Sequence, residues 1–112
     1  MRIKTRQQND VAVVELIGDM KIGAGDVDYR QTIHQLLAQG SRKLLIDVAG
    51  VRSMDSSGLG ELVQSKTTAA TAGATIKLLH VEDKVRHSLS MTRLIGVFET
   101  FDDKLEAIRS FA

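Results

Sequence analysis

Residues 44–63 read LLIDVAGVRSMDSSGLGELV and join a strand pattern to a helix pattern. The run KLLIDV, residues 43–48, is short and apolar, which is typical of a strand buried on both faces. The segment AGVRSMD, residues 49–55, is predicted to be the connection that leaves this strand. A helix is then predicted from about Ser57 to Ala72, because apolar residues recur along one face and Gly73 follows as a stop. This order is typical of a crossover unit in a parallel sheet.

The same kind of signal continues toward the N-terminus. Two strands are predicted around a polar turn at Gln8 to Asp10, and the second covers Val11 to Ile17 and ends at Gly18. The residues DMKIGAG follow as a loop. A helix is predicted from Asp26 to a stop at Gly40. The two strands are expected to form an antiparallel pair, because only a short turn joins them.

The remainder of the chain adds two further strand–helix units. The predicted elements are, in order, a strand over residues 74–81, a helix over 82–94, a strand over 96–101 and a helix over 102–111. Asp103, with Glu106 three residues later, fits a capping box for the last helix. The order ββαβαβαβα predicts an α/β fold, with a mixed sheet of about five strands covered by about four helices, in a single domain over residues 1–112.

Composition excludes several classes of function. Aromatic residues make up 4% of the 112 residues and tryptophan is absent, which argues against a stacking platform for single-stranded nucleic acid. The formal net charge is +1, so the chain has no large basic field for a phosphate backbone. There are no cysteines, which excludes disulfides and cysteine-ligated metal. The apolar runs are too short to span a membrane and no secretory signal is visible, so a soluble cytoplasmic protein is expected.

The centre of the chain does not match two familiar functional patterns. A nucleophile elbow would place glycine two residues before the serine, whereas Met54 and Asp55 stand two residues before Ser56 and Ser57. GELVQSKT, residues 60–67, is one residue short of a phosphate-binding P-loop and lacks its second glycine. An amphipathic helix explains that segment better. The chain is therefore not expected to be an enzyme.

Two further patterns are weak signals for a ligand. Gly23 and Gly25 offer part of a dinucleotide-binding loop, although the third glycine position holds Asp28, and an anion or nucleotide contact at this loop stays open. Asp26 with Asp28, and the acidic pair at residues 102–103, stand at predicted helix starts, where the helix dipole favours negative charge. No metal and no cofactor is therefore expected.

The segment DSSG has more capping residues than one helix needs. Aspartate and serine both accept hydrogen bonds from the N–H groups of a first helical turn. Asp55, Ser56 and Ser57 are redundant for that purpose, and Gly58 and Gly60 are poor helix formers. Spacing alone leaves two hypotheses open, a helix cap only or a cap combined with a functional site.

The chain resembles the STAS domain family of anti-sigma factor antagonists. Residues 44–63 are similar to its central motif, with D-S-S-G-L-G opening a helix after a buried strand. VELIGDM, residues 14–20, resembles the second strand of the family, and residues 74–108 resemble its remaining α/β units. The resemblance covers essentially the whole chain. It implies the mixed sheet predicted above and a role in partner switching.

Partner switching, as the resemblance implies it, depends on a serine phosphate. The unphosphorylated antagonist binds an anti-sigma factor, which is also a serine kinase, and so frees a sigma factor. The kinase then phosphorylates the first serine of the motif, here Ser56, and releases the antagonist, and a phosphoserine phosphatase reverses the change. Asp55, Ser57 and Gly58 surround that position. We expect Ser57 to cap the helix while Ser56 stays exposed.

Lys21 departs from the family pattern, in which the loop after the second strand often holds an aspartate. We expect Lys21 to lie near the start of the helix, because both loops leave the same end of neighbouring parallel strands. With residues 55–58, it makes up the expected partner-binding surface. Two alternatives stay open. One is a non-switching STAS subunit of a larger stress-sensing or transporter-associated complex, and the other is a small nucleotide- or anion-binding domain.

Overall fold

Five extended segments form one mixed sheet in the computed structural model, which describes residues 1–112 apart from the side chain of Asp83. The strand order is β1-β2-β3-β4-β5, with β1 antiparallel to β2 and all other neighbours parallel. The strands are β1 (Arg2–Gln8), β2 (Val11–Met20), β3 (Lys43–Met54), β4 (Thr75–Leu79) and β5 (Thr100–Phe101). The first two strands therefore form the predicted antiparallel pair.

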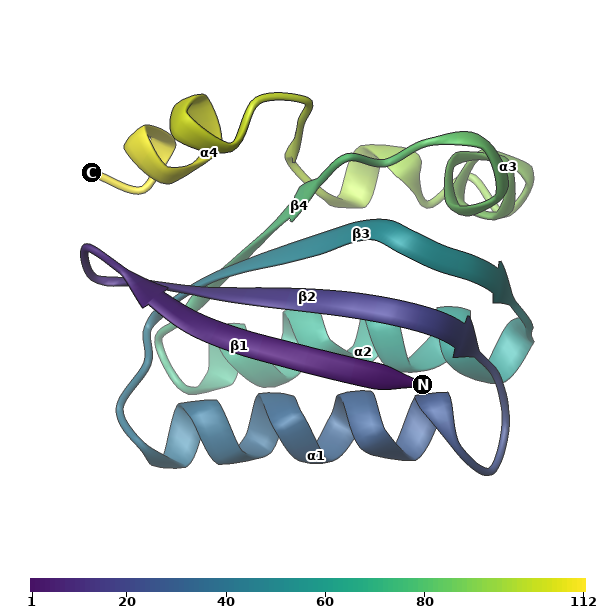
Figure 1. Cartoon of the computed structure of the whole chain (residues 1–112), viewed down its shortest axis with the longest axis horizontal. Coiled ribbons are helices and arrows are strands. Elements are labelled where there is room, and N and C mark those ends of the chain that lie inside the picture. The colour runs from purple at the N-terminus through teal and green to yellow at the C-terminus, as the bar shows by residue number, and fades with distance from the viewer.

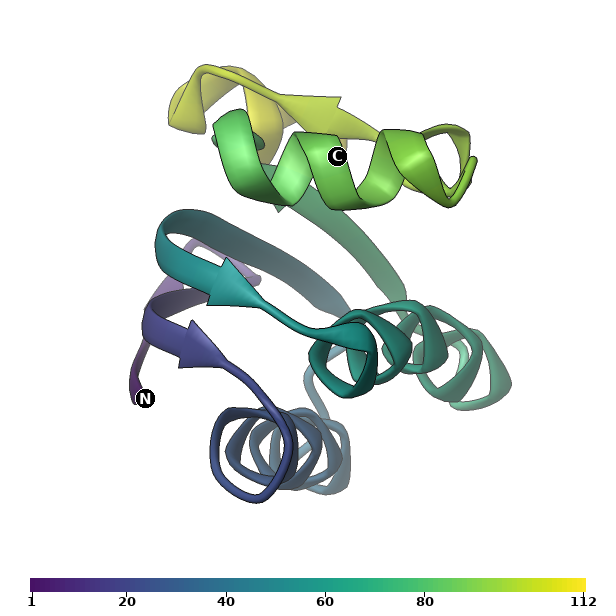
Figure 2. The same cartoon turned by 90° about the vertical axis from the view of Figure 1, so that its right-hand side faces the viewer.

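Helices cover both faces of this sheet. They are α1 (Gly25–Ala38), α2 (Ser56–Thr71), α3 (Asp83–Met91) and α4 (Lys104–Ser110), with a short 3-10 helix, η1 (Ile95–Val97), after α3. α1 and α2 lie side by side on one face, as Figures 1 and 2 show. α4 packs on the opposite face, and α3 packs against the C-terminal half of β3. The predicted α/β fold class, with its ββαβαβαβα order, is confirmed.

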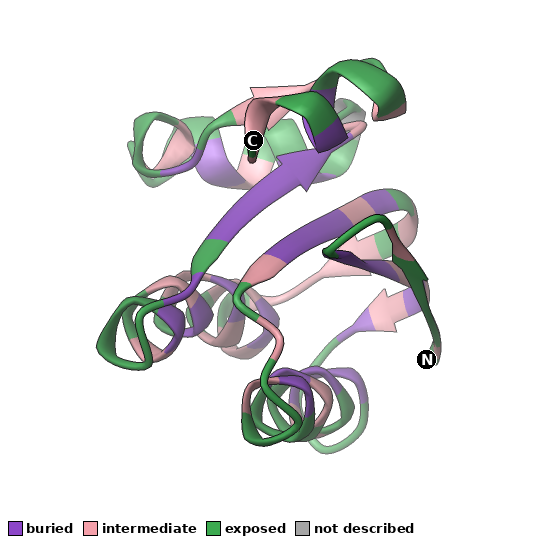
Figure 3. Ribbon diagram, turned by 90° about the vertical axis from the view of Figure 1, so that its left-hand side faces the viewer, coloured by how far each residue is buried: buried purple, intermediate pink, exposed green. Residues whose placement is uncertain are grey.

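β2 and β3 are buried on both faces in their first halves, which explains why their sequences are apolar without alternation. On the face of α1 and α2, Val14 and Ile46 belong to the larger hydrophobic core. On the face of α4, Val13 and Leu45 pack with Ile108 in a smaller core. Figure 3 shows these buried strands between helices whose outer sides are exposed. The two cores hold the strands of the sheet in place, so the loops that follow β2 and β3 are held at the C-terminal end of these strands.

β2 and β3 are both longer than predicted. β2 continues through Gly18 to Met20, and β3 includes residues 49–54, so the prediction of a connection there is wrong. The pairing register shifts between Glu15 and Ile17 and again after Gly18, whose φ of 116° is left-handed. Bulges of this kind insert an extra residue without ending the strand. The glycine that signals a strand end in the sequence is therefore accommodated within the strand.

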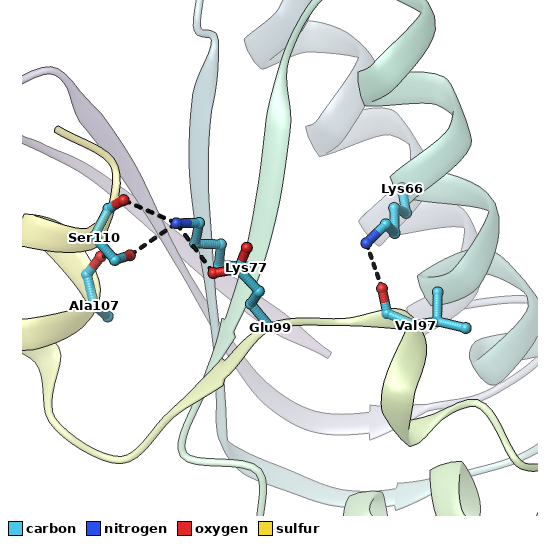
Figure 4. A network of polar contacts seen from close by, with 6 residues as sticks. All are labelled: Lys66, Lys77, Val97, Glu99, Ala107 and Ser110. Carbon is cyan, nitrogen blue, oxygen red and sulfur yellow. Dashed lines mark hydrogen bonds and ion pairs between the residues drawn. The ribbon is translucent and has the colours of Figure 1, made fainter.

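The segment after α3 also differs from the prediction. The predicted strand over residues 96–101 is reduced to Thr100–Phe101, because η1 occupies its beginning, and α3 ends at Met91, earlier than predicted. Lys66 on α2 donates a hydrogen bond to the Val97 carbonyl, which Figure 4 shows. This contact holds η1 against α2. A strand over the same residues would instead have to pair with β4 at the edge of the sheet.

α4 is anchored at its start and at its end. Asp103 caps it as predicted, because its Oδ1 accepts from two backbone N–H groups of the first turn at 2.8 and 3.2 Å. At the other end, Nζ of Lys77 on β4 donates to the carbonyl and hydroxyl oxygens of Ser110, both at 3.0 Å. The same nitrogen lies 3.3 Å from the Glu99 carboxylate (Figure 4) and also 4.6 Å from the ring centre of Phe111. This nearly buried lysine therefore joins α4 to the sheet.

Candidate functional site

The candidate site lies where β2 and β3 end. The two strands are parallel and Met20 pairs with Met54. The loop after β2 and the first turn of α2 therefore both follow the C-terminal ends of these strands, at the same end of the sheet. This end of the sheet is on the right in Figure 1 and faces the viewer in Figure 2. The predicted site residues Lys21 and those at 55–58 therefore come together here from two segments distant in sequence.

Asp55 connects these two segments. Its Oδ1 accepts a hydrogen bond from the Gly58 N–H at 2.9 Å, and its Oδ2 accepts from the Ile22 N–H at 3.0 Å. Its own N–H donates to the Met20 carbonyl at 3.3 Å. The N–H of Ile22, followed by those of Gly58 and Ser57 and the charge of Lys21, lowers the pKa of the Asp55 carboxyl. The carboxylate is therefore held ionised, and one side chain fixes both the helix start and the preceding loop.

Ser57 does not cap the helix, and the expectation that it does is wrong. α2 begins at Ser56, and Asp55 is its N-cap, with extended backbone angles and the capping hydrogen bond to Gly58. Because one acceptor completes the cap, neither serine is needed for it. Ser56 is exposed and Ser57 is half-buried. The part of the expectation that leaves Ser56 exposed is confirmed.

Gly58 is required by a close approach between α2 and β2. A Cβ at this position would lie 1.9 Å from the Met20 carbonyl oxygen and 2.7 Å from Met20 Cγ. Gly60, one residue further along the helix, has nothing within 4 Å of the corresponding position. The first glycine of the motif therefore lets the helix start lie directly against the end of β2, whereas the second has no such packing reason.

Lys21 lies at the same end of the sheet as Ser56, which confirms its predicted position. It is exposed, and its charge helps to lower the pKa of both Asp55 and Asp19. Asp19 is held by the Ser53 hydroxyl at 2.6 Å, the main cause of its lowered pKa, and by Arg52 at 3.3 Å. The ends of β2 and β3 and the loop after β2 therefore bring acidic and basic groups close together.

Ile22 is a residue of this site that the sequence reasoning missed. Its backbone N–H binds Asp55, while its side chain is 72% exposed. The signal was a large apolar residue in a short, glycine-containing loop between a predicted strand and a predicted helix. The exposed side chain gives the charged surface an apolar contact point.

Three backbone N–H groups in and beside the glycine loop already have acceptors within the protein. The N–H groups of Ala24 and Asp26 both donate to the Lys21 carbonyl, at 3.5 and 3.2 Å, and Ile22 donates to Asp55. These three donors are committed within the protein, and a nucleotide or anion contact at Gly23 and Gly25 would have to use other groups. Among the side chains that the structure describes, no group of three or more metal-ligating residues gathers. No helix in the described chain is long and apolar enough to cross a membrane.

Comparison with known proteins gives one family. Residues 3–99 match the family model described as "Mlab, STAS domain". A predicted anti-sigma factor antagonist of Thermotoga maritima is 23% identical over 104 residues, which cover 90% of this chain and 92% of that protein. An anti-sigma factor antagonist from Mycobacterium paratuberculosis has a similar structure, with a TM-score of 0.84 at 18% identity, covering 97% of this chain and 92% of that one.

The fold also matches the Bacillus cell fate determinant SpoIIAA, solved in its phosphorylated form. The TM-score is 0.75 at 18% identity, and the match covers 99% of this chain and 100% of that one. At this level of identity the likeness establishes a shared fold. The arrangement of sheet and helices described above is therefore one that these regulatory proteins use.

Proposed function

Because the chain belongs to the STAS domain family, we propose that it is an anti-sigma factor antagonist that acts by partner switching. In this proposal the unphosphorylated chain binds an anti-sigma factor that is also a serine kinase, and so frees a sigma factor. Phosphorylation of Ser56 releases the chain, and a phosphoserine phosphatase restores it. The proposed setting is the cytoplasm of a bacterium.

The observation that carries this proposal is the exposed hydroxyl of Ser56 in a helix start that another residue caps. Asp55 completes the cap and binds the loop after β2, so the Ser56 side chain has no structural task at the cap. A helix N-terminus also favours an anionic group, because its N–H groups and dipole are positive. The phosphorylated form of SpoIIAA supports the view that this fold accommodates the modification.

The charge of the chain makes one phosphate a large change. The formal net charge is +1, and a phosphoserine adds about −1.5 to −2 charges at neutral pH. One modification therefore reverses the sign of the net charge of the whole chain, and the change is concentrated beside Asp55. We place Lys21, Ile22 and residues 55–58 on the partner-binding surface. The new charge there would weaken binding to a partner whose surface fits the unmodified form.

The test is the affinity of the unmodified, phosphorylated and Ser56→Ala proteins for the cognate kinase, recovered from the native cytoplasm. Ser56→Ala should bind and resist release. The phosphate should cost on the order of 3 kcal/mol, roughly a hundredfold in affinity, and Ser56→Asp should cost less. Ser57→Ala is the matched comparison, since it removes the neighbouring hydroxyl of the same surface but keeps Ser56, so phosphorylation should still release it.

Equal affinities of the unmodified and phosphorylated proteins would overturn partner switching. Mass spectrometry of the recovered protein provides an independent measurement, the occupancy of phosphate on Ser56. A stable complex in which Ser56 is never modified would instead identify a non-switching STAS subunit of a larger assembly.

A further inference from the structure

β3 extends beyond the strand that pairs with it on one side. β4 pairs with residues 43–47 and ends at Leu79, opposite Asp47. β2, on the other side, pairs with β3 as far as Met54. In the sheet that the structure describes, no strand therefore pairs with residues 49–54 on the β4 side. A strand edge of this kind presents N–H and C=O groups that can pair with another chain.

α3 lies beside this edge but leaves a hollow along it. One groove, of about 370 Å³, is lined by Val48, Ala49, Val51, Arg52, Glu82 and Lys84. A second, of about 350 Å³, is lined by Ser53, Met54, Lys84, His87 and Ser88. Lys84 lines both grooves, and we call the two together the β3–α3 trough. Figure 2 shows α3 running past the end of β3.

The walls of the trough carry more basic than acidic groups. Lys84 and His87 project from α3 and are exposed, and no ion pair joins Lys84 to the side chains that the structure describes. Arg52 lines the trough from β3, although Asp19 pairs with it at 3.3 Å. Glu82 is the acidic residue among the lining side chains. A ligand with carboxylates is therefore favoured over one with cations.

We propose that the β3–α3 trough binds an extended acidic segment of a partner protein, which adds a strand to the open edge of β3. Main-chain hydrogen bonds would supply affinity, as in other cases of strand addition. Because alternate side chains of a strand point the same way, every second residue of the segment would face one wall, where a carboxylate meets Lys84 or His87.

The charge of the chain itself argues against a second copy as the occupant. Its own exposed edge strand, β1, carries Arg2, Lys4 and Arg6 at alternating positions, so one face of that strand is mostly basic. Adding it to the trough would set like charges against Lys84. The proposed occupant is therefore another protein, and the site needs no phosphate on Ser56.

The test uses the full chain labelled with ¹⁵N and a capped hexapeptide of alternating glutamate and valine. Binding should shift the amide resonances of residues 49–54 and slow hydrogen exchange at those whose N–H groups point away from β2, apart from Ala49, whose N–H already binds Asp47. Lys84→Glu should weaken binding by about tenfold, since it replaces attraction by repulsion. Lys4→Glu makes the same charge change on β1, away from the trough, and should bind as the unmodified chain does.

Two control peptides separate strand addition from simple charge attraction. A hexapeptide of alternating lysine and valine should not bind. The glutamate–valine peptide with alternate backbone nitrogens methylated keeps its charge but loses its hydrogen-bond donors, and should also fail. Equal binding of either control, no shift at residues 49–54, or full binding by Lys84→Glu would overturn the proposal, and α3 would then be a simple cover for the strand edge.

Discussion

Gly58 and Asp55 define the candidate site at the scale of single residues. Gly58 allows the start of α2 to lie against the Met20 carbonyl, and Asp55 binds the N–H groups of both Gly58 and Ile22. These contacts hold Ser56 at a fixed place without using its hydroxyl. The neighbours of Ser56 thus supply the structure of the site, and its hydroxyl stays available for the proposed phosphorylation.

The two glycines of the motif should respond oppositely to alanine. Gly58→Ala should destabilise the chain by about 3 kcal/mol, because its Cβ overlaps the backbone of β2 and either the helix or the strand must move. Gly60→Ala should stabilise it by up to about 1 kcal/mol, because alanine is the better helix former and meets nothing there. Urea unfolding of both variants measures the difference. A Gly58→Ala protein as stable as the parent would show that the close approach is not required.

Asp55 should make stability depend on pH. Its pKa is lowered in the folded chain, whereas aspartate in an unfolded chain titrates near a pKa of about 3.9. Its contribution is therefore fully present above that value and is lost as the pH falls through the lower, folded pKa. The Asp55→Asn variant keeps the side-chain shape without the charge. The difference in unfolding free energy between the two proteins should be constant near neutral pH and shrink below about pH 4.

The same measurement contains its own control. Asp10 and Asp19 also have lowered pKa values, but they are present in both proteins, so their effects cancel in the difference. If both proteins lost stability in parallel on acidification, the carboxylate of Asp55 would have no special role in holding the loop to the helix.

At the scale of elements, α4 depends on the contacts that the ammonium group of Lys77 makes with its C-terminal end. Its apolar side is small, with Ala107 and Ile108 fully or nearly buried in the smaller core. The side chain of Lys77, 8% exposed, adds hydrogen bonds to Ser110 and contact with the ring of Phe111. A buried ammonium group is costly unless it is paired, so this lysine and the helix end require each other.

Lys77→Ala should loosen α4 in particular. The loss of buried packing and of two hydrogen bonds should cost about 2 kcal/mol, and the amides of α4 should exchange faster than those of α1 or α2. Glu99→Gln is the control, since the Glu99 side chain is 66% exposed and its ion pair should contribute less than about 1 kcal/mol. Uniformly faster exchange in all helices would contradict the view that Lys77 serves α4 specifically.

The order of elements was predictable because apolar runs and helical spacing are local properties. Their ends were less predictable, because they depend on partners distant in sequence. Gly18 signals a stop, yet β2 passes through it, since β3 offers backbone partners as far as Met54. Tyr29 on α1 is fully buried and hydrogen bonds to Ser65 on α2 at 2.8 Å. Nothing in the local sequence predicts that contact.

The candidate site was predictable in its place and not in its detail. Parallel strands β2 and β3 must bring Lys21 near Ser56, and this follows from topology alone. The identity of the cap does not follow, because all three candidates fit the local pattern. Asp55 takes that place because its second oxygen also binds the N–H of Ile22, a residue from another loop. Because the deciding hydrogen-bond donor lies in another loop, the motif alone does not show which residue caps the helix.

At the scale of the whole molecule, the candidate site lies outside both cores. Ser56 is exposed at the edge of the sheet, and the buried residues of α2, such as Leu62 and Ala69, lie further along the helix. A charge placed on Ser56 therefore contacts solvent and the nearby loop, and it displaces no packed side chain. The proposed switch would act by changing the surface that a partner meets, with the fold unchanged.

This view predicts that Ser56→Asp changes binding without changing structure. Negative charge in a first helical turn is favourable by about 0.3–1 kcal/mol, so the variant should be at least as stable as the parent chain. Its amide resonances should shift only near the site, in residues 20–24 and 54–60. Ser57→Asp, with the same charge at a half-buried position, is the matched control and should be less stable than Ser56→Asp. Shifts of resonances in α4 or the smaller core would contradict a surface switch. They would mean that the sheet transmits a rearrangement from Ser56 to its opposite face, which its packing gives no reason to expect.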